Sequence, residues 1–195
     1  MANILALDQA TRTTGYTVLK DGQIVTVSHF TCKGDDLGDR LEQLRKNVQK
    51  LIEEYKIDEV VFEDIQLQDV NGNRETGITT FKMLAEAFGV VHELLTELNI
   101  KYSVALPIKW KAHFKIAGKG RSVEKKLAQA YVAKNFNLNC TEDEADSLCI
   151  AMYYYQTKKA VFDWTEWIKT SCCFFILSEM RTTRGCFYFG IDTKI

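Results

Sequence analysis

The sequence ILALDQATRTTGY, residues 4–16, joins a short apolar run to a carboxylate. Ile4 to Leu7 are continuously apolar, which is typical of a central strand covered on both faces. Asp8 ends this run, and neither of its sequence neighbours is basic. A buried strand that ends on an acid indicates that the acid has a partner elsewhere in the fold.

The residues that follow Asp8 predict a β-hairpin. The stretch TGYTVLKDGQIVTVSHF, residues 14–30, consists of two β-rich runs separated by Asp21-Gly22. That dipeptide is a strong signal for a two-residue turn between antiparallel strands. The chain is therefore expected to open with three strands, of which at least two are antiparallel.

Helices are expected further along the chain. Apolar residues at steps of three and four predict amphipathic helices over residues 36–56 and 78–97. Two more helices are predicted over residues 122–136 and 142–157. The candidate N-terminal caps are Asp35 or Asp36 for the first helix, Ser122 for the third, and Thr141 with Glu144 as a capping box for the fourth.

Two short strands complete the pattern, EVVFED at residues 59–64 and YSVALP at residues 102–107. The element order predicts an α/β fold: a mixed five-stranded sheet in which a hairpin meander is followed by αβαβαα, with helices on both faces. We place this domain in residues 1–160. We treat residues 161–195 as a C-terminal appendage of unknown role, because their cysteines and aromatic residues follow no clear period.

Composition excludes several classes of protein. The 195 residues are 46% apolar and 26% charged, with a formal net charge of -1, which is ordinary for a globular domain and names no partner. The six cysteines show no CxxC pair and no Cys/His ligand spacing, which argues against zinc. No apolar run approaches the roughly 20 residues that span a bilayer. We expect reduced thiols, no membrane partner and a cytoplasmic location.

Acidic residues recur where an α/β fold builds its sites. Asp8 and Glu63 both follow apolar runs at the ends of predicted strands, and the carboxyl edge of such strands is where ligands bind. Asp143 and Asp146 lie three residues apart and therefore share one face of a helix. Each acid also has an ordinary structural explanation, such as a helix N-terminus for Asp143 or a turn for Asp8.

Carboxylates gathered in one cleft repel each other and cannot all stay ionised without a counter-charge. A divalent cation supplies that charge, and Mg²⁺ prefers hard oxygen ligands. Two such ions about 4 Å apart can activate a water and stabilise the leaving oxygen in phosphodiester hydrolysis. We therefore interpret Asp8 as a metal ligand.

A basic stretch precedes the last predicted helix. Residues 101–134 carry nine Lys and Arg residues against the single acid Glu124, which indicates a phosphate-binding surface. We assign DNA contacts to Lys109, Lys111, Lys115, Lys119 and Arg121, and also to Lys125, for which a solvated helix face is an equally good explanation.

Four motifs together resemble a known family. They are LALDQATRTTGYTV, DDLGDRLEQL, VVFEDIQ and DEADSLCIA, within residues 1–160. The chain resembles the RuvC family of Holliday junction resolvases, in the RNase H-like superfamily, and looks most like the RuvC-like endonucleases of lactococcal phages. The resemblance implies an RNase H-like fold, and a location in the bacterial host cytoplasm if the chain is phage-encoded.

The resemblance also implies a function. It makes Asp8, Glu63, Asp143 and Asp146 the catalytic ligands of two Mg²⁺ ions, which Mn²⁺ could replace. It implies a metal-dependent endonuclease that cleaves Holliday junctions and other branched DNA, and a homodimer that nicks two strands symmetrically. The helix of residues 78–95 is apolar on more of its circumference than one core face requires, so it is either the dimer interface or a helix packed deeply between the sheet and its neighbours.

Two departures from the family pattern concern the substrate and the first turn. Gln9-Ala10 stand where Pro-Gly is usual, and Gln66 stands where bacterial RuvC carries an aromatic residue that stacks at the junction centre. Because stacking on one base contributes roughly 1–3 kcal/mol, the absence of the ring predicts a broader range of branched DNA substrates.

Two alternatives have different chemistry. One is a non-catalytic junction-binding protein on the same fold, in which the acids only cap helices and pair with cations. The other is an actin-like phosphotransferase, which would need a second Gly-rich phosphate loop and a much longer chain. Mg²⁺-dependent nicking of a synthetic junction separates these alternatives from the nuclease.

Overall fold

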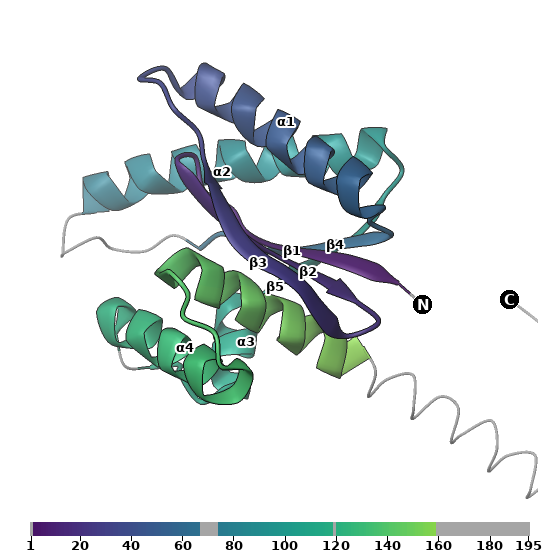
Figure 1. Ribbon diagram of the computed structural model, residues 1–195. Coiled ribbons are helices and arrows are strands. Elements are labelled where there is room, and N and C mark those ends of the chain that lie inside the picture. Colours follow the sequence, from purple (N-terminus) through teal and green to yellow (C-terminus); the bar gives the residue numbers. More distant parts are fainter. Residues whose placement is uncertain (1, 67–73, 119, 159–195) are drawn as a thin grey trace, which may run out of the picture. The chain divides into compact units, whose positions relative to one another are not determined.

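A computed structural model describes residues 2–66, 74–118 and 120–158 (Figure 1). Its five strands form one sheet in the order β3-β2-β1-β4-β5. The strands are β1 (Asn3–Asp8), β2 (Thr13–Lys20), β3 (Gln23–Thr31), β4 (Glu59–Glu63) and β5 (Lys101–Ala105). The first three pair antiparallel, whereas β1, β4 and β5 run parallel, so the sheet is mixed as predicted.

The predicted hairpin joins β2 to β3. Asp21 and Gly22 both have positive φ, 53° and 82°, as a two-residue type I′ turn requires. A Cβ at Gly22 would also lie 2.2 Å from the Tyr155 ring, so this ring would have to move. The turn is thus specified mainly by its backbone conformation.

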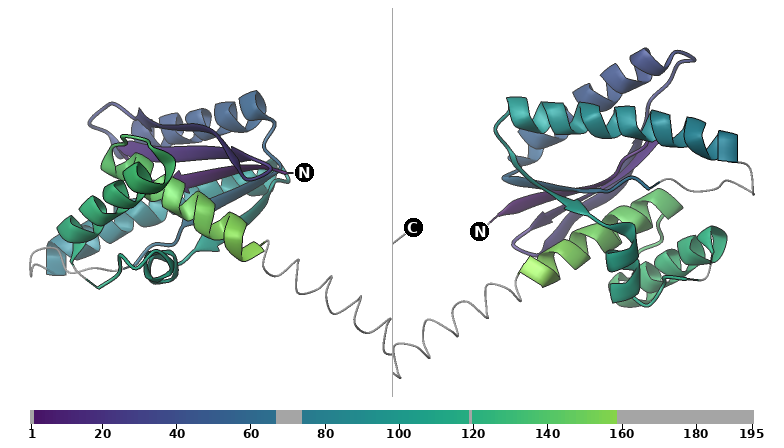
Figure 2. Two further views of the ribbon diagram at one scale, coloured as in Figure 1. Left: turned by 60° about the horizontal axis from the view of Figure 1, so that its bottom comes forward. Right: turned by 180° about the vertical axis from the view of Figure 1, so that it is seen from behind.

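Helices cover both faces of the sheet (Figures 1 and 2). On one face lie α1 (Leu37–Tyr55) and α2 (Arg74–Glu97). On the other lie α3 (Pro107–His113), α4 (Arg121–Phe136) and the helix of residues 142–158. Among the described residues, no helix combines the length and the apolar character needed to cross a membrane.

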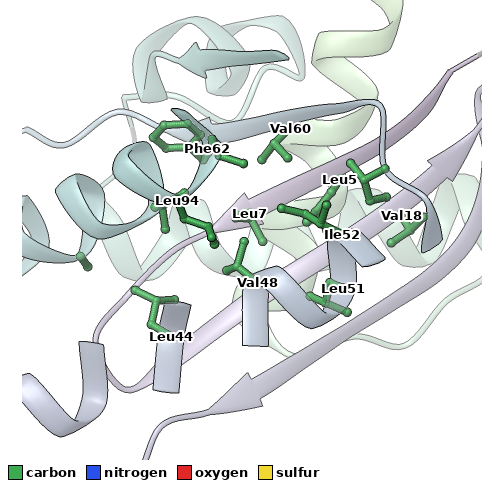
Figure 3. Close-up of a cluster of buried hydrophobic side chains, with 14 of the residues drawn as sticks. Leu5, Leu7, Val18, Leu44, Val48, Leu51, Ile52, Val60, Phe62 and Leu94 are labelled. Atoms are coloured by element: carbon green, nitrogen blue, oxygen red, sulfur yellow. The ribbon is translucent and has the colours of Figure 1, made fainter. Parts of the chain in front are cut away.

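The continuous apolar run of β1 is explained by two cores. Leu5 and Leu7 point toward α1 and α2, where they meet residues such as Val48 and Leu94 (Figure 3). Ile4 and Ala6 lie in the second core, beneath α3, α4 and the 142–158 helix. Each face of this strand is therefore buried, as expected of the central strand of a covered sheet.

Two predicted helix caps are confirmed. The Asp36 side chain accepts hydrogen bonds from the backbone at Gly38, at 2.7 Å, and at Asp39. In the capping box, the Thr141 backbone N–H donates to Glu144 Oε2 at 2.8 Å, and the Glu144 N–H donates back to Thr141 Oγ1 at 3.4 Å. These bonds satisfy N–H groups that a helix leaves unpaired at its start.

Other sequence-based boundaries were wrong. The α2 helix begins at Arg74, four residues before the predicted start. Pro107 does not only end a strand but starts the unpredicted helix α3, since proline fits the first helical turn. Ser122 is not a cap, because α4 begins at Arg121 behind Gly120. The predicted appendage, residues 161–195, lies outside the described residues.

Candidate active site

Two neighbouring parallel strands bring the first two acids together. Asp8 is the last residue of β1 and Glu63 is the last residue of β4, and these strands pair directly. Because both strands run in the same direction, their carboxyl ends meet at one edge of the sheet. The parallel β1–β4 ladder therefore places the two strand-end acids close together, as predicted.

The 142–158 helix supplies the other two acids. Gly15 of β2 lies opposite Asp8 in the strand register, and a Cβ on Gly15 would come within 2.0 Å of the Asp143 carbonyl oxygen. The bare glycine thus lets the start of this helix rest on β2, beside the end of β1. All four predicted acids, Asp8, Glu63, Asp143 and Asp146, line one cavity of about 260 Å³.

The carboxylates of this cavity are short of counter-charge. Burial is the largest cause that raises the pKa of Asp8 well above its ordinary range, and the other three carboxylates raise it further. Burial also raises the pKa of Glu63, against the opposing hydrogen bond from Trp110. Burial and the charge of Glu63 raise the pKa of Asp146 to about 7. The cavity therefore favours an added positive charge.

Three predicted DNA-binding cations line the same cavity. Lys125 Nζ lies 3.0 Å from Glu142 Oε2 and 3.2 Å from Asp143 Oδ1. Lys111 Nζ lies 3.2 Å from Glu124 Oε2, and Arg121 is exposed at the start of α4. The basic stretch thus reaches the acids themselves, as its position before the last helix indicated.

The other predicted cations are not brought to the cavity. Lys109 on α3 and Lys115 just after it are exposed, and neither lines the cavity. Lys119 lies outside the described residues. Any phosphate contacts of Lys109 and Lys115 would therefore fall beside the site and not within it.

Within the described residues, no three Asp, Glu, His or Cys side chains are arranged closely enough to hold a metal ion. Two of the acids have partners of their own: Trp110 Nε1 donates to Glu63 Oε1 at 2.8 Å, and Lys125 Nζ lies 3.2 Å from Asp143 Oδ1. The donor set nevertheless fits a hard divalent cation, because all four predicted acids line one cavity and three of them have raised pKa values.

Gln9 and Trp110 are the site residues that sequence reasoning missed. Gln9, only 5% exposed, donates from Nε2 to the Glu63 carbonyl at 2.5 Å and accepts from the Glu63 N–H at 3.1 Å. With these two bonds, the Gln9 side chain extends the hydrogen-bond ladder between β1 and β4 past the end of β1. Trp110 lies within the basic stretch that we assigned to DNA binding, and no spacing in the sequence linked either residue to Glu63.

The raised pKa of Asp146 predicts a pH dependence of stability for the metal-free protein. In the unfolded chain the aspartate loses its proton near pH 3.9, whereas the folded chain holds the proton until about pH 7. Between these values the folded state binds more protons, so the free energy of unfolding falls as pH rises. Thermal melts in EDTA should show this fall, and Asp146→Asn should flatten it. An equally steep fall in Asp146→Asn would contradict the prediction.

Comparison with known proteins identifies the family. Residues 4–154 match the family described as "Crossover junction endodeoxyribonuclease RuvC". A relative with that description from Syntrophomonas wolfei is 29% identical over 157 residues, which cover 76% of this chain and 86% of the relative. Another from Geotalea uraniireducens is 27% identical over 157 residues, with 76% and 85% covered.

Solved structures share the fold. Thermus thermophilus RuvC in complex with Holliday junction substrate has a TM-score of 0.62 at 12% identity, over 80% of this chain and 96% of that one. The yeast mitochondrial Holliday junction resolvase Ydc2 has a TM-score of 0.56 at 12% identity, over 87% and 84%. The predicted RNase H-like sheet is confirmed by this likeness, whereas closeness to phage enzymes stays a prediction. The chain belongs to the RuvC family of crossover junction endodeoxyribonucleases.

Proposed function

We propose that this protein is a metal-dependent endonuclease that cleaves Holliday junctions and other branched DNA by hydrolysing phosphodiesters. Asp8, Glu63, Asp143 and Asp146 are the proposed metal ligands. The observation that carries the proposal is the cavity in which a RuvC-family chain gathers these carboxylates from β1, β4 and the 142–158 helix. The raised pKa values of Asp8 and Asp146 support the proposal, because a bound cation would stabilise the ionised form of both carboxylates.

The chemistry divides between the cations and the protein. Two Mg²⁺ or Mn²⁺ ions, when bound, supply the activation of a water and the stabilisation of the leaving oxygen. The carboxylates fix where that charge sits. Lys111, Arg121 and Lys125, which line the same cavity, attract the DNA phosphate and orient the scissile bond toward the acids.

Substrate choice follows from the rim of the cavity. Gln66 is exposed at this rim and offers an amide in place of a stacking ring. Base stacking contributes roughly 1–3 kcal/mol, so its absence favours a nuclease that accepts several branched forms. We propose four-way junctions as one substrate among these, in the cytoplasm of a bacterial cell.

The deciding experiment uses a synthetic four-way junction labelled on each strand in turn. The full chain should nick it in Mg²⁺ or Mn²⁺, not in EDTA, and should leave a linear duplex of the same sequence intact. Junction binding without nicking in either metal would support the alternative, a non-catalytic junction-binding protein.

Arg121→Gln tests the basic wall of the cavity. Removing one phosphate-binding charge should flatten the log-log dependence of DNA affinity on salt by about one unit, equally for all sequences. Lys46→Gln is the control, because Lys46 is an exposed residue of α1, on the opposite face of the sheet. Binding measured over a range of salt concentrations should show the change only for Arg121. A weakening that depends on DNA sequence would contradict a phosphate-binding role.

We also propose a homodimer, since two symmetric nicks need two active sites on one body. The α2 helix buries Ala87, Val91, Leu94 and Leu95 in its own core, so the apolar stripe available for a partner is narrower than the sequence indicated. Ile78 is 38% exposed, and Met83 and Val90 are half-buried.

Met83→Glu combined with Val90→Glu should therefore give a folded monomer that nicks one strand at a time, because charge at a dimer interface is costly to bury. Sedimentation measures the mass, and Lys50→Glu on α1 is the control. If the variant stays dimeric, the interface lies elsewhere. If it unfolds, Met83 and Val90 belong to the core and not to an interface.

A further inference from the structure

The only polar atom of the Trp110 side chain, Nε1, donates a hydrogen bond to Glu63, one of the proposed metal ligands. Trp110 is only 1% exposed, and an indole N–H can donate but not accept. Its partner is Glu63 Oε1, at 2.8 Å. A buried N–H needs an acceptor, and this chain supplies it with a carboxylate of the cavity instead of a backbone carbonyl.

The short helix α3 is what places this indole. Glu63 pairs with Ala105 at the end of β5, and the Asp64 N–H donates to the Ala105 carbonyl at 2.9 Å, so the two strands end together. The α3 helix starts at Pro107, two residues later, and reaches Trp110 within its first turn. The indole therefore comes from an element that is directly anchored to the end of β4.

Glu63 is thus held at both its backbone and its side chain. Gln9, the residue after β1, bonds to the N–H and the carbonyl of Glu63, and Trp110 on α3 bonds to its carboxylate. Neither residue needs to touch DNA or metal to affect Glu63. Lys111, the neighbour of Trp110, keeps its Nζ 5.3 Å from the centre of the indole ring and lines the cavity.

We propose that Trp110 is a positioning residue, which engages Glu63 Oε1 and leaves Oε2 as the oxygen presented to a divalent cation. This inference rests on the proposed function, because it requires Glu63 to be a metal ligand. Hydrogen bonds to ligating side chains fix their orientation, and removal of such a bond typically costs roughly 10–100-fold in metal affinity or activity.

The first test measures Mn²⁺ binding to the full chain by calorimetry, without DNA. Trp110→Phe should bind Mn²⁺ about 10-fold more weakly than the wild type. In junction cleavage at saturating metal, kcat should fall while KM for the junction stays within about twofold, because no DNA-binding group is removed. Phe114→Leu is the matched control: Phe114 packs in the same core but does not line the cavity, so it should lower only the melting temperature.

A spectroscopic test reports the environment of the Trp110 indole, which lies against Glu63. The chain has three tryptophans, and Trp164→Phe with Trp167→Phe leaves Trp110 alone. Its fluorescence should then change on addition of Mg²⁺ and saturate at the concentration that supports cleavage. Where Trp110→Phe does not fold, the near-isosteric benzothienylalanine, which lacks the N–H, replaces Trp110 and should bind Mn²⁺ about 10-fold more weakly as well.

Glu63→Gln distinguishes a failure of the Trp110 role from a failure of the proposed metal site. If Glu63→Gln loses Mn²⁺ affinity while the Trp110 variants bind and cleave like the wild type, Trp110 only fills the core and this inference is wrong. If Glu63→Gln itself binds Mn²⁺ normally, Glu63 is not a ligand and the proposed function of this residue fails instead.

Discussion

Asp8→Asn should reduce junction cleavage by at least about a thousand-fold while leaving junction binding intact. Asp8 lies at the end of β1, in the cavity that Glu63, Asp143 and Asp146 also line, and the amide removes one charge from this set of proposed ligands without changing the shape of the side chain. Single-turnover cleavage and filter binding with the same labelled junction measure the two effects. Cleavage within about tenfold of the wild type would remove Asp8 from the site.

The same substitution should stabilise the metal-free protein. The raised pKa of Asp8 means that its ionised form is disfavoured in the folded state, so the folded protein is penalised at every pH above the ordinary range of an aspartate. Asparagine avoids this penalty, so in EDTA at pH 8 we expect Asp8→Asn to have a higher Tm than the wild type.

Added Mg²⁺ should narrow or reverse that difference, because a cation that binds only the folded state stabilises it by mass action. Thermal melts with and without Mg²⁺ for both proteins measure the effect. A metal-free Asp8→Asn that melts well below the wild type would show that Asp8 is a structural partner and not a ligand.

Gly15→Ala should be the most damaging small substitution outside the acids. The added Cβ would lie 2.0 Å from the Asp143 carbonyl oxygen and 2.3 Å from its carbon, and these are backbone atoms that cannot rotate away. The 142–158 helix must therefore move off β2. We expect the unfolding free energy to fall by about 1–3 kcal/mol.

Cleavage by Gly15→Ala should fall about 100-fold or more, since a shift of about 1 Å in a catalytic group can cost that much. Gly89→Ala is the matched control: nothing lies within 4 Å of a Cβ there, and Gly89 sits inside α2. Alanine at that position should stabilise by about 0.5–1 kcal/mol. Wild-type melting and cleavage in Gly15→Ala would mean that the helix start is not confined by β2.

Local patterns accounted for most of the fold. Short stretches of sequence predict the apolar run of β1, the Asp21-Gly22 turn and the helical period of α1. The structure contains all three. The seven residues of α3 were missed because one or two turns show no period, and because a proline that can end a strand can also begin a helix.

The candidate site divides in the same way. Its four acids could be predicted from the sequence, because a carboxylate at the end of an apolar run and a pair three apart on a helix are local signals. The sequence thereby determined which residues are suited to hold a cation and which edge of the sheet they occupy. Whether they bind it is tested by the substitutions above.

Only the tertiary structure decided what surrounds those acids. Gln9 bonds to a residue 54 positions away, Trp110 to one 47 positions away, and the Gly15 Cα faces the backbone of Asp143. No period or short motif encodes such contacts, because they exist only once β1, β4, α3 and the 142–158 helix have packed. Local sequence patterns thus identified the acids, and the packing of distant elements decided how Glu63 is held and how closely the Asp143 backbone approaches Gly15.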